Sequence, residues 1–387
     1  MTPPSHDAFA ALIGIDWADA NHDICLQAAG TAQRAGFQRE HTPEAIDAWG
    51  TTRRTRFQGQ PVALCLALHT GPLVFALRTY DFLGLFPIQP LTVARSRAAC
   101  TPSRAPEDPP AAALPLALLR THRDKLPPLQ PPSLTRRALA PLVPHRRRVV
   151  GEQGRLTNRL TRTVKNYVPQ GRPWFPDKDT TLCCDFLSRW PPLQAAQLAR
   201  RTTLATCCRA HHVRSADVIA PHMQAIQSAT PLTTDEGLIA PPALVVQALV
   251  AQLRVPLQAI ADFDTAIAQR AQSPPACPLF PALPGAGPVF APRLLVAFGE
   301  QRERYATAAE LQKYAGIAPV TERSGKKSWV HWRLQCPKFL RQTFVEWAAE
   351  AMRHAFWAQR SYQQQRDQGK AQQAAVRALA FQWLRML

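Results

Sequence analysis

Residues 11–27 read Ala-Leu-Ile-Gly-Ile-Asp-Trp-Ala-Asp-Ala-Asn-His-Asp-Ile-Cys-Leu-Gln. Apolar residues alternate along the first part, a turn through Asp-Ala-Asn follows, and a second alternating run returns. This pattern predicts a β-hairpin that opens a sheet. Asp16 falls inside the first predicted strand, where a carboxylate is either a functional group or a polar residue at a strand end.

Two further apolar runs, 62–68 and 83–88, flank a helix-like segment at 73–80. Together they predict a β-α-β unit beside the hairpin. Residues 1–133 are therefore assigned to an α/β domain. Prolines crowd residues 101–133, so a helix expected around 112–120 should be interrupted or start late.

From about residue 134 the chain is predicted to be helical and strongly basic, with Leu156, Leu160 and Val164 along one side. We interpret this arm as a solvated helix or one strand of a coiled coil. Its cations are candidates for nucleic-acid binding, above all the run Arg146, Arg147 and Arg148.

Shorter helices are predicted over 183–230. Beyond them, apolar residues recur at spacings of three and four: Val246, Leu249, Leu253, Pro256, Ile260, Phe263 and Ile267. A coiled-coil seam has this spacing, and so does the core helix of a bundle; Pro256 counts against both. Residues 134–272 are assigned to a helical and coiled-coil linker region.

Residues 273–387 are predicted to form a mainly α C-terminal domain. Its first motif, Leu-Pro-Gly-Ala-Gly-Pro at 283–288, indicates a helix-hairpin-helix-like turn between helices. The backbone amides at Gly285 and Gly287 would suit a nucleic-acid phosphate. Gly-x-Gly turns are common, so the turn alone identifies nothing.

The segment 321–333 reads Thr-Glu-Arg-Ser-Gly-Lys-Lys-Ser-Trp-Val-His-Trp-Arg. Ser324 beside Gly325 offers a small nucleophile on flexible backbone, and the surrounding cations would hold phosphate and stabilise a negatively charged transition state. The segment thus indicates phosphodiester chemistry; the alternative is a solvated basic loop between a strand and a helix. The cations are Arg323, Lys326, Lys327 and Arg333.

The aromatic residues of this segment have two interpretations each. Trp329 and Trp332 either stack on unpaired bases or belong to the core, and we expect one of them in the core. His331 is a strand-face histidine or, less favoured, a proton acceptor for Ser324.

The charge balance favours a nucleic-acid partner. The formal net charge is +19, and of the 46 basic residues eight are Lys and the remaining 38 are Arg. Arginine contacts phosphates through two parallel hydrogen bonds and stacks on bases. A biased codon usage would explain the Arg-to-Lys ratio but not the net charge.

The nine Cys residues form no Cys-x-x-Cys repeat, and no secretory segment precedes them. Neither a zinc site nor a disulfide framework is indicated, and the bacterial cytoplasm is the expected location. No apolar run is expected to reach the ~18–20 residues that cross a bilayer, so no membrane partner is expected.

Short motifs spread in order over nearly the whole chain resemble those of the IS-one-ten insertion-sequence transposases. They are Ile-Gly-Ile-Asp-Trp-Ala (13–18), His-Arg-Asp-Lys-Leu (122–126), Arg-Leu-Thr-Asn-Arg-Leu (155–160), Pro-Leu-Thr-Thr-Asp (231–235), the turn at 283–288, Ala-Phe-Gly-Glu (297–300), Tyr-Ala-Gly-Ile-Ala-Pro-Val-Thr-Glu-Arg-Ser-Gly-Lys-Lys (314–327) and Cys-Pro-Lys-Phe-Leu-Arg-Gln-Thr-Phe (336–344).

This resemblance implies a RuvC-like N-terminal domain of the RNase H type with Asp-Glu-Asp-Asp carboxylates, and a C-terminal domain with a nucleophilic serine. It also implies Mg²⁺ as cofactor, and DNA and a structured guide RNA as partners. Homodimers or homotetramers would place one subunit's serine beside another's carboxylates. Carried over to this chain, the serine is Ser324 and the retained metal-binding carboxylates are Asp16 and Asp108.

Two of the four implied carboxylates are missing. Ala67 stands where the family has Glu, and Ala111 stands at the second position of its Asp-x-x-Asp-Ala element. Mg²⁺ held by Asp16 and Asp108 alone would bind weakly. Glu107, Asp19 or Asp23 could substitute. Two hypotheses follow: a recombinase that acts through Ser324 with attenuated activity, or a catalytically inactive remnant that binds nucleic acid.

Overall fold

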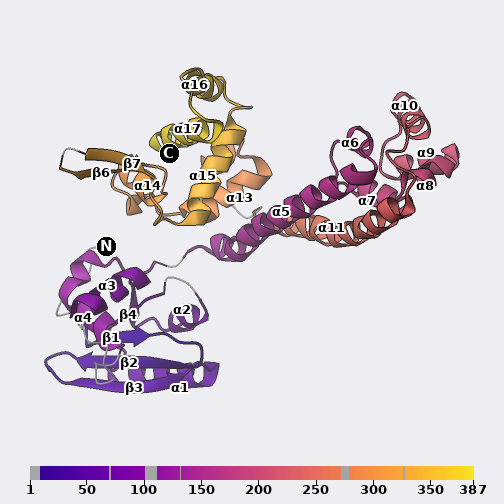
Figure 1. Ribbon diagram of the computed structural model, residues 1–387. Coiled ribbons are helices and arrows are strands. Elements are labelled where there is room, and N and C mark those ends of the chain that lie inside the picture. The colour runs from indigo at the N-terminus through magenta and orange to yellow at the C-terminus, as the bar shows by residue number, and fades with distance from the viewer. Residues whose placement is uncertain (1–8, 69–70, 101–110, 131, 272–278, 326) are drawn as a thin grey trace. The chain divides into compact units, whose positions relative to one another are not determined.

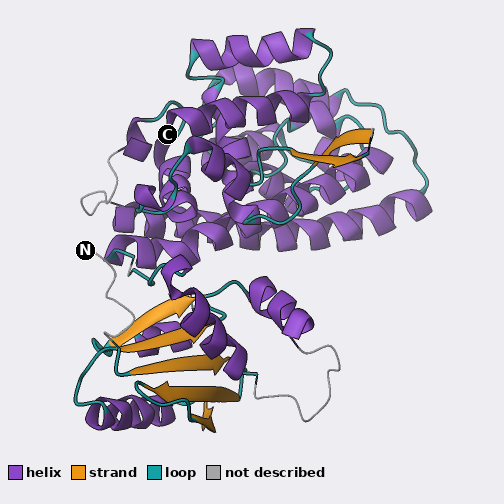
Figure 2. Ribbon diagram, turned by 90° about the vertical axis from the view of Figure 1, so that its left-hand side faces the viewer, coloured by secondary structure: helices purple, strands orange, loops and turns teal. Residues whose placement is uncertain are grey.

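The computed structural model describes residues 9–68, 71–100, 111–130, 132–271, 279–325 and 327–387. The chain divides into two compact units, Met1–Pro131 and Pro132–Leu387 (Figures 1 and 2). The first unit is built on a sheet, and the second is almost entirely helical. Each unit has its own hydrophobic core.

The first unit contains a five-stranded sheet in the order β3-β2-β1-β4-β5. Strand β2 (Asn21–Ala28) runs antiparallel to both of its neighbours, β1 (Ala11–Asp16) and β3 (Arg34–Glu40), whereas β4 (Val62–Leu66) and β5 (Leu83–Pro87) are parallel to β1. The predicted hairpin is confirmed as β1–β2. Asp16 is the last residue of β1, so the expectation that it lies mid-strand was wrong.

Helices cover both faces of this sheet. On one face, α1 (Pro43–Arg56) and α2 (Pro72–Leu77) pack on side chains such as Ile13 and Leu64, and α2 completes the predicted β-α-β unit. On the other face, α3 (Pro90–Cys100) and α4 (Ala113–His122) pack on Ala63 and Cys65.

Helix α4 begins close to its expected start and runs without interruption, although it contains Pro115. Pro115 lies in the first turn, where backbone N–H groups have no partner within the helix, so its missing donor costs little. The expected interruption by proline therefore does not occur.

Two long antiparallel helices, α5 (Leu134–Tyr167) and α11 (Glu236–Ala271), form the body of the second unit (Figure 1). The predicted apolar stripe of α11 is buried at Val246, Leu249 and Leu253, where α5 contributes Leu160 and Val164 to the same core. Near the other end, Leu139, Val143 and Ile267 join a second core.

Helix α11 is long and apolar enough to cross a membrane by length and composition, contrary to the expectation that no segment would be. Its apolar content has another explanation in this fold, because the stripe toward α5 and α7 is buried. Arg254, in the middle of the helix, pairs with Asp185 of α7 at 2.5 Å. These are features of a helix packed within protein.

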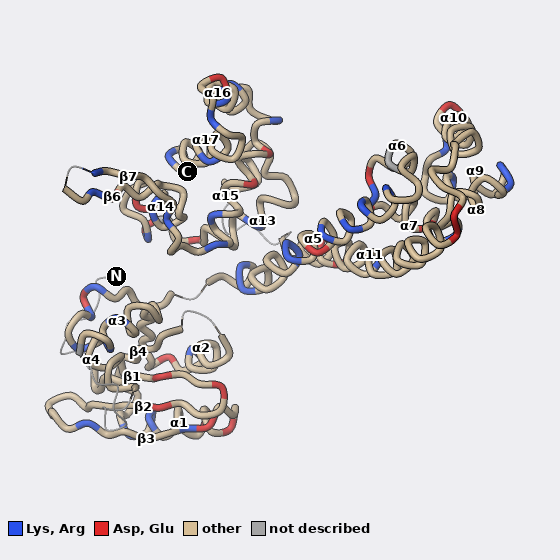
Figure 3. The backbone as a smooth tube through the Cα atoms, viewed as in Figure 1, with Lys and Arg blue, Asp and Glu red and all other residues tan. Residues whose placement is uncertain are grey.

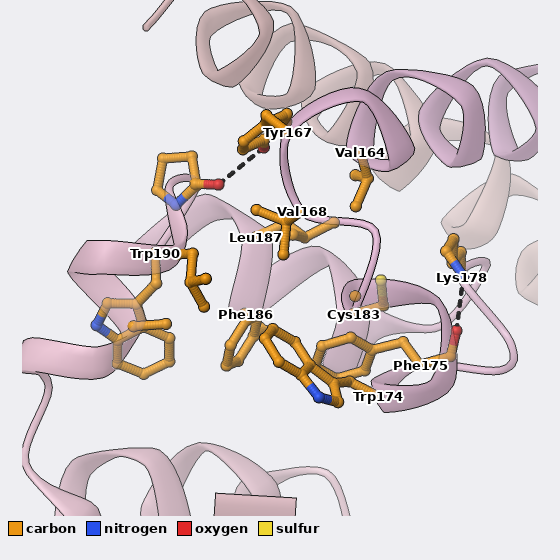
Figure 4. A pocket seen from close by; sticks show the side chains of 14 residues that line it. Val164, Tyr167, Val168, Trp174, Phe175, Lys178, Cys183, Phe186, Leu187 and Trp190 are labelled. Atoms are coloured by element: carbon orange, nitrogen blue, oxygen red, sulfur yellow. Dashed lines mark hydrogen bonds between the residues drawn. The ribbon is translucent and has the colours of Figure 1, made fainter. Parts of the chain in front are cut away.

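Short helices fill the end of the second unit where α5 and α11 are joined. The pocket shown in Figure 4 has a volume of about 20 Å³, which holds about one water molecule. Tyr167 Oη donates to Pro191 O at 2.8 Å, and the buried Lys178 Nζ donates to Phe175 O at 2.9 Å. The region is therefore a packed core. Its helices are α6 (Gly171–Trp174), α7 (Thr181–Arg189), α8 (Leu193–Leu198), α9 (Arg201–Ala210) and α10 (Ala216–Gln227).

The C-terminal part packs around Phe344 and Trp347, both fully buried. The segment that was open to interpretation as a basic loop instead forms a two-stranded hairpin, β6–β7. The elements are α12 (Leu279–Ala282), α13 (Gly287–Phe298), α14 (Ala308–Tyr314), β6 (Val320–Ser324), β7 (Lys327–His331), α15 (Lys338–Ala351), α16 (Phe356–Asp367) and α17 (Gln372–Met386).

Candidate functional site

Ser324 lies at the exposed tip of the β6–β7 hairpin. It is the last residue of β6 and pairs directly with Lys327, the first residue of β7. Gly325 supplies the positive φ of 59° that the tight turn requires. The alternation of the strands places Ser324 and Lys327 on the same face, so the hydroxyl has a cation directly across from it. Lys326 lies outside the described residues.

The carboxylate of Glu322 is engaged within the hairpin. Its Oε1 lies 2.8 Å from His331 Nε2, and its Oε2 accepts a hydrogen bond from Trp329 Nε1 at 3.1 Å. The bond to Glu322 and a second to Trp332 O raise the pKa of His331. His331 is thus an ion-paired residue on a strand face. Ser324 Oγ has no hydrogen-bond partner within the described residues.

Both tryptophans of the segment are exposed. Trp329 is 45% exposed and Trp332 is 42% exposed, so the expectation that one of them belongs to the core was wrong. Trp329 belongs to β7, whose residues are all exposed, and Trp332 follows directly after it, so neither indole reaches the core. Arg323 is exposed on the opposite face of β6 from Ser324, and Arg333 is half-buried beyond β7.

The two glycines of the turn at 283–288 have different surroundings: Gly285 packs closely against other residues, and Gly287 is exposed. A Cβ on Gly285 would lie 3.0 Å from His354 Cδ2 and 3.1 Å from the backbone of Ala351, so this residue fits closely against α15. Gly287 is exposed, with open space where a Cβ would be. Of the two glycines, Gly285 is half-buried and Gly287 is the more exposed.

The arginine run of α5 mostly holds the unit together. Arg146 forms a double hydrogen bond with Asp264 of α11, one of 2.9 Å, and Arg147 Nη2 lies 2.6 Å from Glu346 Oε1 of α15. Arg148 is exposed. Of the three predicted nucleic-acid contacts, only Arg148 presents a guanidinium that these ion pairs do not occupy.

A second candidate site lies at one end of the sheet in the first unit. Asp16 is directly opposite Asp23 on β2, and its β1 neighbour Ile15 aligns with Leu66 on β4. Ala67 therefore follows β4 beside Asp16. Figure 3 shows acidic segments at this end of the sheet.

The start of α4 is pressed against the same face. A Cβ on Gly14 would lie 2.2 Å from Ala112 O and 2.5 Å from Leu116 N. Gly14 and Asp16 share a face of β1 because they are two residues apart. The beginning of α4, with Ala111 just before it, is thus held at the face that carries Asp16.

The electrostatics around Asp16 combine burial with one cation. Asp16 is 39% exposed, and burial raises the pKa of its carboxyl. Arg97 Nη2, 3.8 Å from Asp16 Oδ2, lowers that pKa, and Asp23 raises it. Asp23 Oδ1 also accepts a hydrogen bond from Gln38 Nε2 at 2.8 Å.

The described residues do not by themselves fit a magnesium site. Among them no group of three or more His, Cys, Asp or Glu side chains could hold a metal ion. Ala67 and Ala111 carry no side-chain atom that could bind a metal ion, and Arg97 offers Asp16 a protein cation instead. Asp108 and Glu107 lie outside the described residues, and Asp19 is exposed in the β1–β2 turn.

Comparison with known proteins identifies the family. Residues 13–169 match a DEDD transposase family, and residues 277–364 match the family described as Transposase IS116/IS110/IS902. A Streptomyces coelicolor protein named "Mini-circle putative transposase for IS117" is 27% identical over 398 residues, which cover 98% of this chain and 94% of that protein. The chain belongs to the IS110 family of transposases. Its N-terminal part accordingly carries a DEDD transposase domain of the RNase H-like superfamily, and membership implies DNA binding.

Sequence reasoning missed several cations that the fold brings to these sites. Arg97 reaches Asp16 from α3, and Arg341 and Arg377 reach Trp332 from α15 and α17. None of the three stands in a local pattern that marks it, because each contact joins residues from different elements.

Proposed function

We propose that this transposase cuts and rejoins DNA strands by transesterification at Ser324. The observation that carries the proposal is the position of Ser324 at an exposed hairpin tip, facing Lys327 and free of internal hydrogen bonds within the described residues. A nucleophile that must reach a phosphodiester in a large polymer has to project from the surface. The family membership supplies the substrate class.

In the proposed step, Ser324 Oγ attacks the phosphorus and loses its proton to a base. The bond from Oγ to phosphorus forms, the bond from phosphorus to the 3′ oxygen breaks, and the 3′ oxygen takes up a proton. Attack by the 3′ hydroxyl of another strand reverses these changes, rejoins DNA and restores the serine. Lys327 stabilises the charge that develops on the phosphoryl oxygens.

The base for this step is proposed to come from outside the hairpin. Glu322 is already bonded to His331 and Trp329, so it is a poor acceptor for the serine proton. This supports a composite site in a homodimer or homotetramer, in which another subunit's Asp16 face approaches Ser324. We further propose that a structured guide RNA takes part in target choice, and that the protein acts in the cytoplasm.

The face around Asp16 favours a second candidate function. Because Ala67 lies beside Asp16 and Arg97 already approaches its carboxylate, Mg²⁺ should bind this face weakly. A chain that binds nucleic acid, keeps the fold and does not cut would have this arrangement. We therefore expect strand cleavage by the natural chain to be weak.

The test is a search for a covalent adduct on end-labelled DNA carrying the element's terminus, with its flanking RNA and Mg²⁺, resolved on a denaturing gel. Ser324→Ala should abolish the adduct, and Ser328→Ala, in the same hairpin but on the other face, should leave it unchanged. An adduct that persists in Ser324→Ala would refute the assigned nucleophile. DNA binding without any adduct would favour the second candidate.

A further inference from the structure

A groove of about 640 Å³ runs between β7 and α17 at the base of the hairpin that carries Ser324. One wall contains Val330, His331 and Trp332, and the other contains Arg377, Phe381 and Arg385. No acidic side chain is among the described residues that line it. The groove therefore combines apolar and aromatic surface with unbalanced positive charge.

Trp332 is the centre of this arrangement. It remains 42% exposed although two guanidinium groups approach its ring, Arg377 with Cζ 3.7 Å from the ring centroid and Arg341 at 5.3 Å. Arg377 Nε donates to Gln373 O at 3.0 Å, and Arg341 Nη1 donates to Arg333 O at 3.2 Å. These backbone contacts fix the guanidiniums without neutralising them.

Among the described residues, neither the cations that line the groove, Arg377 and Arg385, nor the neighbouring Arg341 has a carboxylate partner. Within the described residues, no ion pair involves Arg341, Arg377 or Arg385, whereas Arg146, Arg147 and Arg293 of the same unit all pair with Asp or Glu. Burial and the charge of Arg341 lower the pKa of Arg377, as expected where like charges gather. Such a cluster is stabilised by an anionic ligand, and an exposed indole beside it suits a planar one.

We propose that this groove binds an unpaired nucleic-acid strand, with a base stacked at Trp332 and phosphates held by Arg377 and Arg385. Single-strand sites generally combine aromatic stacking platforms with a basic track along the backbone. The inference rests on the proposed function and extends it, because β7 leads from the groove to Ser324. From His331 to Lys327, which faces Ser324, the strand spans about 13 Å at ~3.3 Å per residue.

The proposal predicts which strands the groove takes and what each side chain contributes. We would measure the anisotropy of labelled single-stranded DNA and single-stranded RNA of equal length, and of duplex DNA, with the full chain. Trp332→Ala should weaken single-strand binding about 5- to 150-fold, from ~1–3 kcal/mol per stacked base. Arg385→Gln should make the log–log salt slope less steep by about 0.7.

Matched controls are Trp357→Ala, which removes an indole 38% exposed on α16, and Arg360→Gln, which removes an exposed charge from the same helix. Both should bind single strands as the natural chain does. Whether the groove variants weaken the binding of single-stranded DNA, of single-stranded RNA or of both identifies the strand that the groove holds. If Trp332→Ala does not fold, the salt dependence of Arg385→Gln tests the proposal instead, because Arg385 is exposed.

Three outcomes would overturn the proposal. Groove variants that bind both single strands as tightly as the controls would show that the groove is not a binding site. A natural chain that binds duplex DNA but neither single strand would remove the groove proposal and leave the proposed function standing. If the chain binds no nucleic acid of any form, both proposals fail.

Discussion

Replacing Gly14 with alanine should separate α4 from the sheet and thereby disturb the face that carries Asp16. The added Cβ would lie 2.2 Å from Ala112 O, 2.5 Å from Leu116 N and 2.9 Å from Leu116 Cβ. Normal carbon contacts are about 3.5–4.0 Å, so the first contact is more than 1 Å too short. Two of the three obstacles are backbone atoms of the α4 region, which cannot rotate away as a side chain could.

Overpacking of this kind costs about 1–3 kcal/mol, and backbone obstacles place Gly14→Ala at the upper end. Alanine also restricts the unfolded chain, which returns about 0.4–1 kcal/mol. The net loss should be about 2–2.6 kcal/mol. The control is Gly84→Ala on β5, where the added Cβ would lie at an ordinary 3.4 Å from its nearest neighbouring atoms. The unfolding free energy should therefore change by no more than about 1 kcal/mol.

Hydrogen exchange measured by mass spectrometry reports on this unit separately from the rest of the chain. Peptides from β1 and α4 should exchange about 30- to 80-fold faster in Gly14→Ala, the ratio that corresponds to about 2–2.6 kcal/mol. Peptides from Pro132–Leu387 should not change. Equal exchange in Gly14→Ala and Gly84→Ala would refute the close approach of α4 to β1.

Three further predictions concern pH, a buried ion pair and salt. Burial lowers the pKa of His22 below 6.5, and the neighbouring charge of His41 lowers it further. The unfolded state therefore binds more protons than the folded state, so the stability of the first unit should fall as the pH drops from 6.5 through that lowered value. Urea unfolding at pH 7.5 and 5.5 checks this, and His22→Gln should reduce the difference in unfolding free energy between the two pH values. The buried Arg293 has its Nη1 2.8 Å from Glu346 Oε2, and Glu346→Gln should lower the unfolding free energy by about 3 kcal/mol because it leaves this guanidinium without a charged partner. The control is Glu350→Gln, whose partner Arg353 is 77% exposed, and it should cost less than ~1 kcal/mol. Nucleic-acid affinity should fall steeply between 50 and 200 mM salt, with a log–log slope of about −7 to −9 for ten phosphate contacts, and a flat titration would contradict the binding role.

Much of the sheet could be predicted because its inner strands have a clear hydrophobic pattern. The hairpin 11–27 alternates, and β4 and β5 are continuous apolar runs, so both were recognised. Strand β3 was not, since its residues Arg34–Glu40 are exposed at the sheet edge and alternate little. The β6–β7 hairpin is exposed on nearly every residue, and for the same reason it could be interpreted as a loop.

The site could be predicted only where strand order determines it. Strand β4 lies next to β1 in the sheet order and parallel to it, which brings Ala67 beside Asp16. The roles of Arg146 and Arg147 could not be predicted, because Asp264 and Glu346 lie 118 and 199 residues away along the chain. The same applies to Arg97, whose approach to Asp16 depends on how α3 packs.

The central claim is that Ser324 is the nucleophile and that the reduced carboxylate face of the first unit limits it. The direct test measures the covalent protein–DNA adduct, with RNA and Mg²⁺, in the natural chain, in Ala67→Glu/Ala111→Asp, and in that double variant with Ser324→Ala. Metal affinity depends on ligands acting together, so the double variant should form at least tenfold more adduct, single restorations less, and the variant lacking Ser324 none. The account would be contradicted if the natural chain formed as much adduct as the double variant. It would also be contradicted if an adduct formed in the variant that lacks Ser324.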